Sequence, residues 1–190
     1  MESKLFTPVT FGPLTLRNRT IRSAAFESMC PGNAPSDMLL DYHRSVAAGG
    51  IGMTTVAYAA VTQSGLSFDR QLWMRPEIIP GLRRLTDAIH AEGAAAGIQL
   101  GHCGNMSHKS ICGCMPVGAS SGFNLYSPTF VRGLRADELP EMARAYGRSV
   151  NLAREAGFDS VEIHAGHGYL ISQFLSPSTN HRKDEFGGSL

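Results

Sequence analysis

Two histidines and a tyrosine follow an apolar run, and their types and spacing suit chemistry on a small ligand. His164 and His167 are three residues apart, and Tyr169 follows after one glycine. Because only alanine and glycine separate the histidines, the chain can turn sharply and direct both rings at one spot. Two imidazoles aimed at one oxygen can polarise a carbonyl or nitro group, and such a preorganised donor contributes about 3–4 kcal/mol in a transition state. The simpler alternative is one buried structural histidine, one solvated histidine and a packing tyrosine.

The same segment also fits a metal site. Glu162 and His164 are two residues apart on a predicted strand and therefore share a face, and His102 and His167 could lie nearby. Zinc or manganese accepts such ligands, although Glu-x-His-x-x-His is not a strong metal-binding spacing. A metal-dependent barrel hydrolase or lyase is therefore an alternative function.

Gln99 ends another apolar run and is the third candidate for ligand contact. A side-chain amide donates and accepts hydrogen bonds, which suits a heterocycle that carries both kinds of group. The alternative is an amide whose partners are neighbouring backbone groups.

Alternating strands and helices must position these side chains. Four mainly apolar runs predict strands at residues 20–25, 51–61, 95–100 and 160–163, and residues 6–16 predict a hairpin turned at Gly12 and Pro13. Amphipathic segments predict helices at about 36–48, 76–92 and 137–156, with Ser36 and Asp137 suited to cap two of them.

This alternation predicts an α/β fold with a parallel sheet whose strands are covered on both faces. A doubly wound sheet and a (β/α)8 barrel both fit, and in both of them ligands bind at the carboxyl ends of the strands. The absence of GxGxxG after the first strand and of GxxxxGK[ST] disfavours a nucleotide-binding doubly wound sheet.

The long segment 101–136 interrupts the alternation and is rich in Gly, Ser, Asn and Pro. A connection of this length after a strand end predicts a partly ordered active-site loop. It holds Cys112 and Cys114, and with no CxxC in the chain we expect its four cysteines to be free thiols.

Composition narrows the class of protein further. The 190 residues are 43% hydrophobic with a net charge of +1, enough for one core and without a basic stripe for nucleic acid. No run is long enough for a membrane span, and no signal-peptide core follows Met1. We expect a cytoplasmic protein with a small-molecule substrate and with neither nucleic acid nor membrane as partner.

With these residues in view, the chain resembles the N-terminal half of the old yellow enzyme family, the FMN-dependent NADH:flavin oxidoreductases and ene-reductases. The matching segments, in order, are residues 5–8 (LFTP), 16–19 (LRNR), 99–102 (QLGH), 157–164 (GFDSVEIH), 167–170 (HGYL), 173–177 (QFLSP), 180–182 (NHR) and 184–189 (DEFGGS). No single segment is decisive, but their order and spacing are specific.

The resemblance implies a (β/α)8 TIM barrel with FMN across its mouth, of which this chain holds about the first four strand–helix units. NADH or NADPH would reduce the flavin, which passes hydride to an activated alkene or similar acceptor. By position, Gln99 would contact the flavin, His164 and His167 would hold the substrate's oxygen, and Tyr169 would donate a proton to carbon.

Two strand tips would also pass their backbone against the flavin ring, the first at Ser23, Ala24 and Ala25 and the second near Tyr58. Phe26 would face the substrate. Ala24 stands where relatives often carry Pro, and Phe26 where many carry Thr or Cys. Flavin potential and substrate range therefore do not follow from the resemblance.

The resemblance treats residues 1–190 as half of one FMN-binding domain, with an N-terminal hairpin at 1–19 and an active-site loop at 101–136. The last family motif normally continues past Leu190, and the flavin phosphate site belongs to the later half. We therefore expect a truncated chain whose edge strands pair with another chain or a second copy. An inactive fragment without the phosphate site is the remaining functional alternative.

Overall fold

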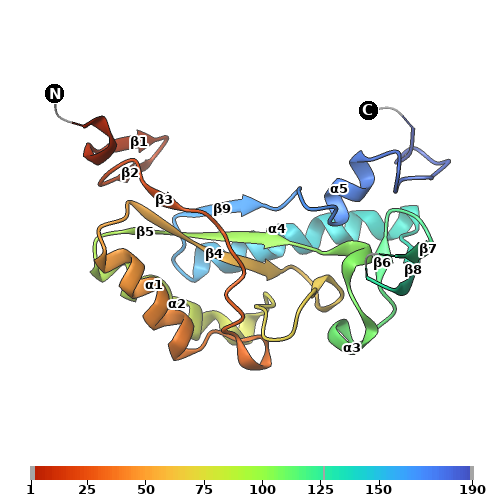
Figure 1. Cartoon of the computed structure of the whole chain (residues 1–190), viewed down its shortest axis with the longest axis horizontal. Coiled ribbons are helices and arrows are strands. Elements are labelled where there is room, and N and C mark those ends of the chain that lie inside the picture. The colour runs from red at the N-terminus through yellow and green to blue at the C-terminus, as the bar shows by residue number, and fades with distance from the viewer. Residues whose placement is uncertain (1–2, 126, 189–190) are drawn as a thin grey trace.

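A four-stranded parallel sheet forms the centre of the molecule in a computed structural model that describes residues 3–125 and 127–188 (Figure 1). Its strands are β3 (Ile21–Arg22), β4 (Met53–Ala60), β5 (Ala95–Gly101) and β9 (Ser160–Ile163), and they neighbour one another in that order. Because each strand pairs only with its predecessor and successor, the order never reverses, unlike that of a doubly wound sheet. The arrangement is that of consecutive units of a (β/α)8 barrel.

Three main helices connect the strands, α1 (Asp37–Ala48), α2 (Ile79–Ala91) and α4 (Leu139–Glu155). The predicted cap of α1 is confirmed, because the Ser36 hydroxyl accepts the Leu39 N–H at 3.1 Å. The predicted cap of α4 is wrong. Asp137 lies inside a 3-10 turn, and the Glu138 carboxylate accepts the Arg135 N–H at 2.8 Å.

The helices cover one face of the sheet, where the hydrophobic core lies. Leu39, Leu82 and Ile89 from the helices are fully buried against Ile98 and Leu100 from β5. The expectation that both faces are covered is wrong for the described residues. On the other face, a Cβ at Gly97 would approach the hydroxyls of Ser160 and Thr55, so this face is lined by small and polar groups.

The hairpin of β1 (Val9–Phe11) and β2 (Leu14–Leu16) lies at the amino end of the sheet, at the opposite end of the molecule from α5 (Leu170–Leu175) (Figure 1). Strand β3 is much shorter than the predicted 20–25, because the chain leaves the ladder after Arg22. Helix α5 was not predicted. Short 3-10 turns cover Lys4–Phe6, Pro31–Asn33, Gln63–Gly65, Pro76–Ile78, Gly104–Met106 and Ala136–Glu138.

The segment 101–136 is more ordered than expected. It forms α3 (Lys109–Cys112) and a three-stranded sheet of β6 (Val117–Gly118), β8 (Thr129–Gly133) and β7 (Gly122–Asn124), in that spatial order. Strand β8 pairs parallel with β6 and antiparallel with β7. These short strands carry too little periodicity to be found from sequence.

The four cysteines are free, as predicted, and only Cys114 is exposed. Within the described part of the chain, no helix is long and apolar enough to cross a membrane.

Candidate active site

Four aromatic rings meet at the carboxyl ends of β4 and β9. Nδ1 of His167 lies 3.1 Å from Nε2 of His164. The ring of Tyr169 lies 4.9 Å from that of His164, centroid to centroid, and Tyr58 lies 5.8 Å from His164 and 5.4 Å from Tyr169. The prediction that the two imidazoles converge is confirmed, and the structure adds Tyr58 to the group.

Backbone hydrogen bonds to the end of β5 and to the residues after it hold the histidine turn in place. The His164 N–H donates to Leu100 O at 2.8 Å, and the Leu170 N–H donates to His102 O at 2.9 Å. Between these anchors, His167 adopts φ +56° and Gly168 φ +68°. The left-handed region is uncommon for a residue with a side chain, and residues held there often lie at functional sites.

Burial sets the protonation of these rings. Desolvation and the neighbouring His167 lower the pKa of His164, while Glu162 opposes them, so His164 is neutral at pH 7. Burial raises the pKa of Tyr169 against a hydrogen bond with Ser67, and burial likewise raises that of Tyr58. The site therefore holds two protonated phenols beside the neutral imidazole of His164.

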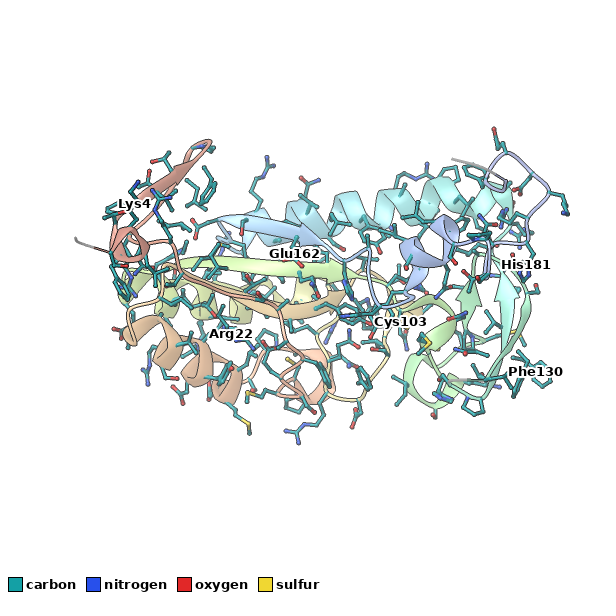
Figure 2. All side chains as sticks on the ribbon, turned by 45° about the horizontal axis from the view of Figure 1, so that its top comes forward. Lys4, Arg22, Cys103, Phe130, Glu162 and His181 are labelled. Carbon is teal, nitrogen blue, oxygen red and sulfur yellow. The ribbon has the colours of Figure 1, made fainter. Side chains whose placement is uncertain are left out.

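Gln99 lies on the same face of the sheet as the rings. Successive side chains of a strand alternate in direction, so Gln99 shares its face with Gly101, where a Cβ would lie 2.9 Å from Tyr58 and 3.2 Å from His164. The Gln99 amide donates to the Glu162 carboxylate at 2.5 Å. Glu162 therefore orients Gln99. Arg22 on β3 and Glu162 on β9 mark the two edge strands in Figure 2.

The predicted metal site does not form. His102 is fully buried, where its Nε2 contacts Ser64 Oγ at 3.1 Å and its Nδ1 accepts the Gly104 N–H at 2.9 Å. Burial lowers the pKa of His102 to about 4. Both nitrogens have partners, so His102 is a structural residue. No group of three or more His, Cys, Asp or Glu residues within 3–125 and 127–188 could hold a metal ion.

The first strand tip, at Ser23, Ala24 and Ala25, follows β3. In the strand order β3-β4-β5-β9, β3 is the edge strand opposite β9, which leads into the histidine turn. The Arg22 guanidinium fixes it by donating to Ala25 O at 3.1 Å and to Thr55 O at 2.6 Å. Phe26 stacks on Phe68, with ring centroids 4.8 Å apart.

Phe68 and Tyr169 line one cavity of about 570 Å³ between the ring cluster and the segment 101–136. Its other lining residues are Ser67, Asp69, Met106, His108, Ser110, Ile111 and Ser127. Phe26 thus reaches the cavity wall through Phe68. The volume is within the range of pockets for small organic ligands.

A buried carboxylate, Glu27, was missed from sequence. It lies 3.0 Å from Arg22 and 3.2 Å from His43, and it accepts the Ala57 N–H at 3.2 Å. Its side chain is 5% exposed. No local pattern marks one glutamate in a loop as buried, because its partners come from three different elements.

Known proteins match both the sequence and the fold of the chain. The 4,4'-dithiodibutanoate disulfide reductase of Rhodococcus erythropolis is 43% identical over 186 residues, which are 98% of this chain and 46% of that protein. An NADPH dehydrogenase of Bacillus subtilis is 37% identical over 194 residues, which cover 100% of this chain and 56% of that protein. The chain thus spans about half the length of these curated relatives.

The solved structure of the old yellow enzyme homologue from Zymomonas mobilis superposes with a TM-score of 0.90 at 30% identity, over 98% of this chain and 55% of that one. The strand–helix units described above are therefore the N-terminal half of a (β/α)8 barrel, as the resemblance implied. Residues 4–190 match the NADH:flavin oxidoreductase / NADH oxidase family throughout. The chain belongs to this family of FMN oxidoreductases, the old yellow enzymes.

Proposed function

We propose that the protein carrying this chain is an FMN-dependent NAD(P)H oxidoreductase of the ene-reductase type. The observation that carries the proposal is the convergence of His164 Nε2 and His167 Nδ1, 3.1 Å apart, beside Tyr169. These groups lie on the sheet face that also presents Gln99. When bound, FMN would supply hydride transfer from a nicotinamide to the acceptor.

The uncovered face of the sheet fits a planar flavin ring. Gly97 and Gly101 add no side chain to that face, and a Cβ at either position would meet its neighbours at 2.9 Å, so a larger residue would push those neighbours toward the ring. Gln99, oriented by Glu162, offers the ring edge an amide that can donate and accept. The backbone of Ser23, Ala24 and Ala25 and that near Tyr58 would flank the ring.

The two histidines would bind the acceptor's electron-withdrawing oxygen. An oxygen placed between His164 Nε2 and His167 Nδ1 would replace their mutual hydrogen bond and accept one from each. Imidazole rings suit this role, because a ring N–H of each histidine can point at the oxygen. Such donors stabilise the negative charge that develops on that oxygen as hydride adds to the substrate.

Tyr169 would supply the proton that completes reduction of the double bond. Its phenol is protonated at neutral pH, since burial raises its pKa, and its ring lines the cavity that Phe68 and Phe26 border. Activated alkenes would enter through this cavity. The segment 101–136, which forms much of its wall, would act as the active-site loop.

NADH or NADPH would be the reductant, in line with the family description and with the Bacillus subtilis relative named an NADPH dehydrogenase. We place the protein in the cytoplasm, which suits four free thiols. The exposed edge at β9, where Ile163 is 45% exposed, would pair with another segment or a second copy.

FMN titration of the purified protein tests the proposal. We expect stoichiometric binding with a shifted flavin spectrum, and loss of binding in Gln99→Ala. The double variant His164→Ala/His167→Ala should keep FMN and lose reduction of an enone such as 2-cyclohexenone by at least about a hundredfold. The exposed His181→Ala is the matched control. A colourless protein indifferent to FMN would refute the cofactor, and unchanged turnover in the double variant would refute the anchor.

A further inference from the structure

Cys112 and Cys114 form a dithiol on the surface of the segment 101–136. Their Sγ atoms are 3.6 Å apart, and the Cys112 thiol also donates to Cys114 O at 3.2 Å. Cys112 ends α3 and is buried, whereas Cys114 is exposed. Gly113 joins them at φ +72°, a left-handed helix cap that brings the two side chains together.

We propose that Cys112 and Cys114 are a thiol–disulfide exchange site that small aliphatic disulfides oxidise to an intramolecular Cys112–Cys114 bond. The sulfurs are already in contact, so closing the bond to about 2.05 Å needs only a small movement of either side chain. The site is separate from the histidine and tyrosine cluster and does not depend on a bound flavin.

The exchange proceeds in two balanced steps. The Cys114 thiolate attacks one sulfur of R–S–S–R, forms a mixed disulfide and expels R–S⁻, which takes up a proton. The Cys112 sulfur, after losing its own proton, then attacks Cys114 Sγ and expels the second R–S⁻. Two thiols of the protein are oxidised, and one R–S–S–R is reduced to two R–SH.

Access and charge favour Cys114 as the thiol that attacks the reagent first. It lines a cavity of about 540 Å³ beside Met115 and Thr62. The charged residues of that cavity are Arg132, Arg135, Asp137, Glu138, Glu141 and Arg148. Arg132 is bonded to Glu138 at 2.6 Å, and its positive charge still favours the thiolate.

Desolvation of the sulfur and the hydrogen bond with Cys112 outweigh Arg132 and raise the pKa of Cys114 to about 11. Exchange should therefore be slow at pH 7 and accelerate about tenfold for each pH unit below 11, because only the thiolate reacts.

Oxidation at this position reaches the cavity beside Tyr169. Ile111, one residue before Cys112, lines that cavity and packs on the cluster of Tyr58 and Leu66. Helix α3 has only four residues, and its last bonds run from the N–H groups of Cys112 and Gly113 to His108 O and Lys109 O. A movement of Cys112 at the carboxyl end of α3 should therefore also move Ile111, the residue before it.

Thiol counting on the 190-residue chain tests the site. Reduced protein is incubated with 2-hydroxyethyl disulfide, denatured, alkylated and mapped by mass spectrometry. We expect alkylation to fall from four cysteines to two, with Cys112 and Cys114 joined and two hydrogen atoms lost. Cys30 and Cys103, both buried, should remain alkylated. Raising the pH from 7.5 to 8.5 should accelerate the loss about tenfold.

Single substitutions separate the two steps. Cys112→Ser should stop at a mixed disulfide on Cys114, and Cys114→Ser should gain no adduct under the same conditions. Cys30→Ser should behave like the original chain. A persistent mixed disulfide in the unsubstituted protein, disulfide-linked dimers or four unreacted thiols would each overturn the proposal. If either variant fails to fold, the peptide map of the unsubstituted protein still decides.

Discussion

The Glu27 carboxylate lies 3.0 Å from the Arg22 guanidinium, and this buried pair ties together two neighbouring strand tips. Arg22 donates to Ala25 O on the first tip, and Glu27 accepts the Ala57 N–H on the second. Both tips are those proposed to flank the flavin. One ion pair therefore sets their spacing before any ligand binds.

Replacing Glu27 by Gln should destabilise the protein strongly. The change leaves the largely buried Arg22 without its counter-charge, and breaking such a pair costs about 3–5 kcal/mol. Urea denaturation measures the free energy of unfolding. Glu141→Gln on α4 is the matched control, because Glu141 and Arg144 form an exposed pair at 2.8 Å that contributes little to stability. Equal losses in the two variants would contradict this account.

His102 should make stability fall in mild acid. Its folded pKa, about 4, lies below the ordinary value of 6.5, so the unfolded chain takes up its proton first. Stability is therefore lost as pH falls from about 6.5 to 4, and the loss at pH 5 is about 2 kcal/mol relative to neutral pH. Denaturation at pH 7 and pH 5 measures it. His102→Gln should remove this part of the pH dependence, and an unchanged difference would count against it.

Tyr169→Phe should slow alkene reduction by about a hundredfold, because the proton donor is lost while the oxygen-binding histidines remain. In the original protein the rate should hold into alkaline pH, since the raised pKa keeps the phenol protonated there. Tyr146→Phe is the control. Its buried hydroxyl has no hydrogen-bond partner among the described residues, so turnover should not change. Stopped-flow oxidation of the reduced flavin by an enone gives the comparison.

Gly101→Ala should displace the rings of the site, because the added methyl group projects from β5 toward Tyr58 and His164. The added methyl would lie 2.9 Å from Tyr58 and 3.2 Å from His164, and overpacking of this kind costs about 1–3 kcal/mol. Gly122→Ala is the matched control, because nothing lies within 4 Å of its Cβ position. Thermal unfolding of both variants tests this. A Gly101→Ala protein as stable as Gly122→Ala would mean that the rings move aside freely.

The parts of the fold that sequence predicted are those with local signals. The α1 boundaries follow from Ser36 and from apolar side chains at helical spacing, and the histidine turn follows from Ala165 and Gly166 between the two rings. The sheet of β6, β7 and β8 has no such signal, because Val117 pairs with Arg132 fifteen positions away. Glu27 was missed for the same reason, since its partners come from distant residues.

The metal hypothesis is wrong because His102 is buried and its ring points away from the other expected ligands. His102 and His164 both lie near the sheet's carboxyl end, but His102 is directed at Ser64 and Gly104 inside the protein. Sequence spacing places residues along a strand or loop and does not say which of them is buried. Glu162, the remaining carboxylate of that hypothesis, is bonded to Gln99 instead.

The anchoring of the histidine turn has a consequence for protein engineering. Its two ends are bonded to Leu100 and His102, on the N-terminal neighbour β5 and the residue that follows it, and Gln173 adds bonds to Cys103 O and Gly168 O. Within residues 3–125 and 127–188, these bonds come from β5, from the segment after it and from α5. We therefore expect that β5 and β9, transferred together with the segments that follow them, would keep the imidazole pair aligned in another parallel sheet with the same strand register.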